Sequence, residues 1–279
     1  MNDLSIIHNR DNYLYFMRKF SKYNDDKFSN VINYEYFSAN NDIGLFNIFE
    51  KYKLDRIVNN NNIFLGALKL LEWTFNNLIS NDYGDYKGEY YTIDIVDYAK
   101  NNRVSLNCLC HATVLTELLL SAGYRAKKVY CLSCDIMPSE NHVVVETYIN
   151  ELHKWVMLDP TISGYLVDED EIPLSIDDIR KNLISNKKMR IIYYNRFGGK
   201  KNNCQRLSFD SDDYFAYLCK DFFRFIVCTK QCSLRQPNQG IYNMLVPDNY
   251  LNYTDKIYNY AGYQGWVNLT TNRKSFWEG

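Results

Sequence analysis

The sequence predicts an α+β fold in which helices precede an antiparallel sheet. Two patterns indicate it. Apolar residues recur at helical spacing in the first half of the chain, and runs rich in Val, Ile, Tyr and Thr follow between residues 126 and 158. The chain has 279 residues, of which 46% are hydrophobic, so it can bury a large core. Nothing in it resembles a flexible interdomain linker, and we expect one domain over residues 1–279.

The first clear helix runs from Ile63 to Ile79. Its apolar residues share one face: Phe64, Leu65, Leu68, Leu71, Phe75, Leu78 and Ile79. A shorter helix over Ile93 to Ala99 is predicted, with Thr92 as its cap. Residues 1–60 are polar and aromatic with weak periodicity, which indicates short helices and loops.

Residues 105–162 carry the strongest signals. Apolar residues from Leu109 to Ala122 mark an amphipathic helix, and Gly123 ends it where a left-handed residue is needed. Three β-rich runs follow, at Ala126 to Ser133, Val143 to Ile149 and Trp155 to Leu158. The last run ends at Asp159-Pro160-Thr161, a natural strand stop.

Three more elements are predicted beyond this stretch. Ser175 to Asp178 resembles a capping box that opens a helix to about Leu183. Met189 to Phe197 has the composition of a strand, and Asp213 to Cys228 that of a helix with an aromatic face. The Asn- and Tyr-rich C-terminal end gives no firm prediction.

Charge and hydropathy exclude some functions. The formal net charge is −1 and basic runs are short, so we expect no nucleic-acid partner. No window approaches the ~18 consecutive apolar residues of a membrane span. The N-terminus lacks the pattern of a secretory signal, so we expect a cytoplasmic protein without a membrane partner.

The eight cysteines are expected to be reduced thiols in that compartment. Cys131 and Cys134 form a CxxC pair, and three residues lie between Cys228 and Cys232. Because the second pair has the wrong spacing for a zinc site, we interpret these four as small buried hydrophobic residues. We expect no metal site.

Cys108 stands where the helix that ends at Gly123 should begin. A cysteine nucleophile reacts as its thiolate, and the dipole and free N–H groups of a helix start lower the pKa of a thiol. The same N–H groups can stabilise an oxyanion. Cys110 lies in the same first turn, so position alone does not choose between the two thiols.

His142 and Asp159 lie on two adjacent predicted strands, and their register can be worked out. With a two-residue turn at Asn150-Glu151, His142 falls opposite Asp159. With a four-residue loop at 150–153, Asp159 falls opposite Val144, two residues from His142 on the same sheet face. Only an odd-length loop would separate the imidazole from the carboxylate. Asp159 is therefore a candidate to orient His142 as a base.

These residues resemble the transglutaminase-like superfamily. Its nucleophile helix has a Cys, an Ala four residues later and a Gly fifteen residues after the Cys. Cys108, Ala112 and Gly123 fit this spacing, whereas Cys110 does not. Asn141-His142-Val143 resembles the family's His strand, and Trp155 to Thr161 resembles its Trp-x-x-x-Asp-Pro-Thr ending. The recognisable core covers about residues 60–165, and the remainder matches nothing we can name.

The resemblance implies a papain-like core, with the nucleophile helix packed on an antiparallel sheet, and a catalytic triad of Cys108, His142 and Asp159. It implies cysteine-dependent acyl transfer or hydrolysis on an amide or thioester. The acyl donor would be a protein, a peptide or an acyl carrier, and no cofactor is required. Two alternatives stay open: a catalytically silent binding or scaffolding module, and an arylamine-type thioester acyltransferase. The oligomeric state is left undetermined.

His111 is the main competitor of His142 for the role of base. It lies three residues after Cys108 and so on the same side of the helix. No carboxylate is placed by the sequence to orient it, and we therefore favour His142. His153 is expected in a hairpin loop, exposed to solvent.

Overall fold

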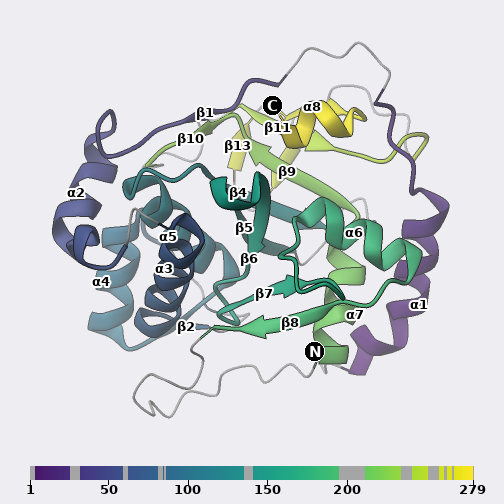
Figure 1. The fold of residues 1–279 in the computed structure, drawn as a ribbon, viewed down its shortest axis with the longest axis horizontal. Helices are drawn as coiled ribbons and strands as arrows, with labels where there is room; N and C mark the ends of the chain where they lie inside the picture. The colour runs from purple at the N-terminus through teal and green to yellow at the C-terminus, as the bar shows by residue number, and fades with distance from the viewer. Residues whose placement is uncertain are drawn as a thin grey trace.

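A six-stranded sheet forms the centre of the molecule (Figure 1), with strand order β14-β11-β9-β4-β5-β6. Its neighbouring strands are antiparallel except for β11 and β14, which are parallel. The computed structural model describes residues 4–25, 32–58, 62–80, 84, 86–134, 141–194, 211–233, 241–250, 258–260, 263–265 and 267–278. The strands of this sheet are β4 (Ala126–Leu132), β5 (His142–Ile149), β6 (Lys154–Leu158), β9 (Arg224–Cys228), β11 (Tyr242–Leu245) and β14 (Val267–Thr270).

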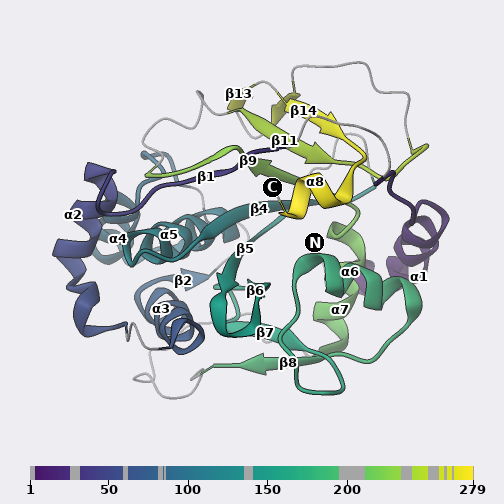
Figure 2. The same ribbon diagram turned by 45° about the horizontal axis from the view of Figure 1, so that its top comes forward.

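Helices cover both faces of the sheet, as Figures 1 and 2 show from two directions. One layer contains α2 (Ile43–Tyr52), α3 (Ile63–Asn77), α4 (Thr92–Asn102) and α5 (Cys108–Ser121). The other contains α1 (Leu4–Lys19), α6 (Ile176–Ser185), α7 (Ser211–Asp221) and α8 (Arg273–Glu278). None of the helices in the described ranges has the length and apolar character needed to cross a membrane.

Four two-stranded pairs complete the described structure. Two are antiparallel, β7 (Gly164–Val167) with β8 (Arg190–Tyr193) and β12 (Tyr258–Tyr260) with β13 (Tyr263–Gly265). Two are parallel, β1 (Glu35–Tyr36) with β10 (Lys230–Gln231) and β2 (Ile79–Ser80) with β3 (Ser105–Leu106). Two short 3₁₀ turns, Leu54–Arg56 and Asn150–Leu152, lie between the larger elements.

The alternation of side chains along β4 and β5 divides the interior into two cores. Tyr130 and Val143 face the layer that contains α5, whereas Val129 and Val144 face the layer that contains α7. Because helices cover both faces, every residue of β4 is buried. The predicted α+β class is thereby confirmed, with α5 packed against β4 and β5.

Several local predictions match the structure. The three strands at 126–133, 143–149 and 155–158 correspond to β4, β5 and β6. Gly123 has a φ of +83° after α5, as a left-handed helix ending requires. The helix predicted from Ile63 ends at Asn77, two residues earlier than expected. In the N-terminal region, α1 has 16 residues and is longer than the short helices expected there.

The predicted helix over Asp213 to Cys228 is wrong in its second half. The helix α7 ends at Asp221, and Arg224–Cys228 form β9 between β4 and β11. All five residues of β9 are buried. A short apolar run that is buried on both faces lacks the period-2 alternation of a half-exposed strand, so periodicity could not distinguish it from a buried helix. The predicted strand from Met189 is β8, and its last residues, 195–197, lie outside the described residues.

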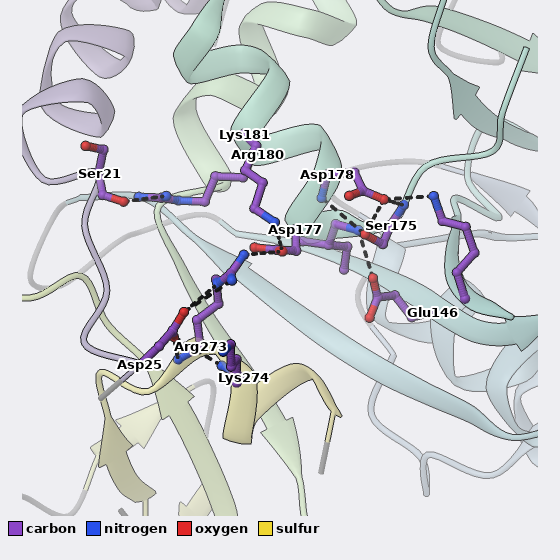
Figure 3. A network of polar contacts seen from close by, with 12 residues as sticks. Ser21, Asp25, Glu146, Ser175, Asp177, Asp178, Arg180, Lys181, Arg273 and Lys274 are labelled. Atoms are coloured by element: carbon purple, nitrogen blue, oxygen red, sulfur yellow. Dashed lines mark hydrogen bonds and ion pairs between the residues drawn. The ribbon is translucent and has the colours of Figure 1, made fainter. Parts of the chain in front are cut away.

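A polar network holds the segment after α1 and the start of α8 against α6 (Figure 3). Arg273 at the start of α8 donates to Asp25 at 3.2 Å and to Asp177 of α6 at 3.0 Å. The predicted capping box at the start of α6 is present, since Ser175 and Asp178 bond each other's backbone N–H groups. The N–H of Ile176 donates to Glu146 of β5 at 2.8 Å. The network therefore ties the N-terminal segment and α8 to the central sheet through α6.

We expect Arg273→Met to lower the free energy of unfolding by about 1–2 kcal/mol, because it removes charge-assisted hydrogen bonds from a partly buried guanidinium. Its side chain is 23% exposed. Lys274→Met is the matched control, since the exposed Lys274 contacts Asp25 through its backbone N–H. Urea denaturation of both variants measures the difference. Equal losses in the two variants would contradict a stabilising role for the Arg273 side chain.

Candidate active site

Cys108 is the first residue of α5, as the sequence predicted. The Asn107 side chain caps the helix by accepting a hydrogen bond from the Cys110 N–H at 3.2 Å. Cys108 is partly exposed, and its thiol lies 3.8 Å from the carbonyl oxygen of Asn141, the residue before β5. The start of α5 and the start of β5 therefore meet at the same end of the sheet.

The two thiols of the first turn differ in their surroundings. Cys110 is fully buried, and burial raises the pKa of its thiol to about 12. Such a thiol is a small apolar side chain with little tendency to ionise. Between the two, Cys108 alone combines solvent access with a place beside β5.

The hairpin between β5 and β6 brings His142 and Asp159 together. Ile149 pairs with Lys154, so the four-residue alternative for the loop is the one observed. Val145 pairs with Leu158, and this register carries Asp159 to the side of Val144. The His142 Nε2 and Asp159 Oδ2 atoms are 2.6 Å apart. Both side chains are buried.

Asp159 also fixes the turn that follows it. Its Oδ1 accepts hydrogen bonds from the N–H of Thr161 at 2.9 Å and from the Thr161 hydroxyl at 2.6 Å. The Asp159 backbone exchanges two hydrogen bonds with Gly164, at 2.8 and 3.1 Å. The two interpretations of Asp159, as a turn former and as the partner of His142, are therefore both realised, one on each carboxylate oxygen.

The electrostatics of this pair favour charge on both members. Burial alone would lower the pKa of His142, but the charge and hydrogen bond of Asp159, with a smaller contribution from Cys108, hold this pKa well above its usual range. Burial alone would raise the pKa of Asp159, yet the charge of His142 and hydrogen bonds from His142, Thr161 and Tyr214 keep it low. Both shifts favour an imidazolium beside a carboxylate, with Cys108 as the neighbour of the pair.

Two aromatic residues of α7 complete the surroundings of the pair, and neither was predicted from the sequence. The Tyr214 hydroxyl donates to Asp159 Oδ2 at 2.8 Å. The Tyr217 ring lies edge-on to the His142 imidazole, with centroids 5.0 Å apart. The sequence indicated only an aromatic face on a helix, and nothing in it connected that face with Asp159.

The other candidate residues lie elsewhere. His111 is fully buried inside α5, and it is His142 that bonds the carboxylate of Asp159. His153 is exposed in the β5–β6 hairpin, as predicted. Cys131 and Cys228 face opposite cores of the sheet, which separates the two cysteine pairs considered for zinc. Within the described ranges, no three His, Cys, Asp or Glu side chains are placed to hold a metal ion.

The arrangement can support nucleophilic chemistry on a carbonyl. A buried imidazolium–carboxylate pair stabilises a neighbouring thiolate, and the imidazolium can deliver its proton to a leaving group. The N–H groups of the first turn of a helix lack intrahelical acceptors, so those of Cys108 and Leu109 can hydrogen-bond a developing oxyanion. These parts come from α5, β5 and the end of β6.

Comparison with known proteins supports the family resemblance. The family model of the transglutaminase-like superfamily matches residues 54–160, a range that contains Cys108, His142 and Asp159. The comparisons with curated proteins and with solved structures gave no match. The helix α7, with Tyr214 and Tyr217, lies outside the matched range.

Proposed function

Since residues 54–160 form a transglutaminase-like region, we propose that this chain is a cysteine-dependent enzyme that transfers an acyl group from an amide or a thioester. Cys108 is the nucleophile, His142 the proton carrier and Asp159 the residue that orients His142. The observation that carries this proposal is the buried His142–Asp159 contact of 2.6 Å beside a partly exposed cysteine at a helix start.

In the acylation step, the Cys108 thiolate attacks the carbonyl carbon, and a C–S bond forms. The resulting oxyanion is stabilised by N–H groups in the first turn of α5. When the tetrahedral intermediate collapses, the bond to the leaving amine or thiol breaks, and the His142 imidazolium gives this group its proton. The product is an acyl-enzyme with neutral His142.

In the deacylation step, neutral His142 takes a proton from water or from an acceptor amine, which attacks the acyl-enzyme carbonyl. The C–S bond breaks, and the thiolate–imidazolium pair is restored. Asp159 fixes the orientation of the imidazole throughout, because its Oδ2 binds Nε2. The other ring nitrogen, Nδ1, is then left to exchange protons with the thiol and the substrate. Water as acceptor gives hydrolysis, and an amine gives transamidation.

The first test is the alkylation rate of each cysteine as a function of pH, resolved by peptide mass spectrometry on the native protein. We expect Cys108 to react fastest below pH 7, because the neighbouring imidazolium favours its thiolate. Cys110 should stay unmodified, since it is buried and burial raises its pKa to about 12. Cys108→Ala should remove the fast-reacting peptide.

Other outcomes would redirect or end the proposal. If Cys110 reacts fastest, the thiol assignment is wrong. If no cysteine of the native protein stands out below pH 7, the catalytic proposal fails, and a silent binding module with this fold is favoured.

A chromogenic ester or thioester then tests for an acyl-enzyme on Cys108 by intact mass. Release of the acid in water supports hydrolysis, whereas a new amide formed with an added amine supports transamidation. Acylation by thioesters together with failure to cleave any amide would favour the arylamine-type acyltransferase.

A further inference from the structure

We propose that Tyr214 is a positioning residue for the Cys108–His142–Asp159 site, acting through its hydrogen bond to Asp159. The proposal rests on the proposed acyl-transfer function and assigns a role to a helix outside residues 54–160. It implies that the C-terminal third of the chain is part of the site.

The hydrogen bond is placed where it affects His142 directly. Tyr214 donates to Oδ2 of Asp159, the same oxygen that contacts His142 Nε2. The other oxygen, Oδ1, is held by Thr161. The Tyr214 hydroxyl therefore holds Oδ2 in place for His142, because a carboxylate fixed by donors on both oxygens cannot rotate without breaking one of these bonds.

Tyr214 is a permanent donor. Its side chain is 1% exposed. Burial, together with the charge of Asp159, raises the pKa of its phenol well above the usual range, so the hydroxyl keeps its proton throughout the working pH range. Phenols of ordinary pKa would begin to lose this donor near pH 10.

The helix α7 is held firmly enough for this role. It packs along α1. Leu218 of α7 and Phe222, which follows the helix, are buried in the core on the α7 side of the sheet. Tyr217, three residues after Tyr214, places its ring against the His142 imidazole. Residues at this spacing share one helix face, so α7 presents a single face to both members of the pair.

The expected consequence is a change in pH dependence. The Tyr214 hydrogen bond favours ionised Asp159, and ionised Asp159 favours the His142 imidazolium. Other titratable groups near the pair are Cys108 on α5, Cys131 on β4 and Tyr193 on β8. Cys131 is buried with a pKa raised well above its usual range, so it stays neutral and does not set the profile.

The test is Tyr214→Phe, which keeps the ring and removes the hydroxyl. The acid-side midpoint of Cys108 alkylation is expected to rise by about one pH unit, as loss of a hydrogen bond to a charged group implies. In an Asp159→Asn background the same change should have no further effect on the midpoint, because the route through the carboxylate is gone. Should Tyr214→Phe not fold, 3-fluorotyrosine at position 214, a stronger donor, should move the midpoint down instead.

Tyr34→Phe is the matched control. Tyr34 is buried in the same core as Tyr214, and its hydroxyl forms no hydrogen bond with any described residue. Loss of this hydroxyl should leave the Cys108 profile unchanged. If wild-type Cys108 reacts at acidic pH but Tyr214→Phe leaves the midpoint unchanged or lowers it, the role of Tyr214 is overturned while the proposed function stands. If wild-type Cys108 itself shows no such reactivity, the proposed function fails first.

Discussion

Replacing His142 with alanine is expected to slow the alkylation of Cys108 at pH 6 by about tenfold, because the cation that favours its thiolate is lost. Asp159 holds the pKa of His142 well above its usual range, which favours the imidazolium, and Cys108 is among the groups that interact with this imidazole. A less stabilised thiolate is intrinsically more nucleophilic, so the alkylation rate should fall by less than the thiolate fraction does. Acyl transfer should be lost, since His142 is the proposed proton carrier.

Two further variants separate charge from folding. His142→Gln can still donate an amide hydrogen to Asp159 but cannot carry a proton, so it should reproduce the loss of reactivity in a folded protein. His153→Asn is the control, because His153 is exposed in the hairpin and Asn tolerates its φ of +50°. An unchanged Cys108 profile in both His142 variants would remove His142 from the proposed mechanism.

Lys127→Met is expected to lower the free energy of unfolding by about 3–5 kcal/mol at pH 7, because it leaves a buried carboxylate without its cation. Lys127 of β4 faces Glu146 of β5, with Nζ 3.4 Å from Oε2 and both side chains almost fully buried. Nζ also donates to the Trp277 carbonyl at 3.2 Å and lies 4.2 Å from the Trp155 ring centroid. Methionine fills this space without the charge. Urea denaturation measures the loss.

The loss should shrink as the pH falls from 7 towards 5. Burial already raises the pKa of Glu146 in the wild type, and removal of Lys127 raises it further. A carboxyl group whose pKa is higher in the folded than in the unfolded chain lowers the free energy of unfolding at any pH above its unfolded pKa. This cost is relieved as the pH falls and the group takes up a proton.

A second variant and a surface control sharpen the test. Lys127→Met combined with Glu146→Gln should recover most of the lost stability, because the amide oxygen can still accept from the Ile176 N–H. Lys51→Met removes a surface ion pair in which the side chains of Lys51 and Asp97 are 39% and 49% exposed. This change should lower the free energy of unfolding by no more than about 0.5 kcal/mol. A Lys127→Met cost as small as that of Lys51→Met would show that the buried pair contributes little.

The structure explains why sequence patterns worked best between residues 105 and 162. The helix α5 and strands β4, β5 and β6 follow one another along the chain, and the hairpin register depends only on the parity of a short loop. Both even-length loops bring His142 near Asp159, so the contact could be predicted before the loop length was known. The resemblance to the transglutaminase-like superfamily selected Cys108 over Cys110, and burial of Cys110 agrees with that choice.

The sequence by itself thus determined the α+β class, the helix that begins at Cys108 and the pairing of His142 with Asp159, because all three follow from local periodicity and short connections. Only the tertiary structure decided that Arg224–Cys228 form a central strand and that Tyr214 reaches Asp159. Both depend on contacts between segments far apart in the chain. Such contacts depend on the packing of the whole core, and no local sequence pattern predicts them.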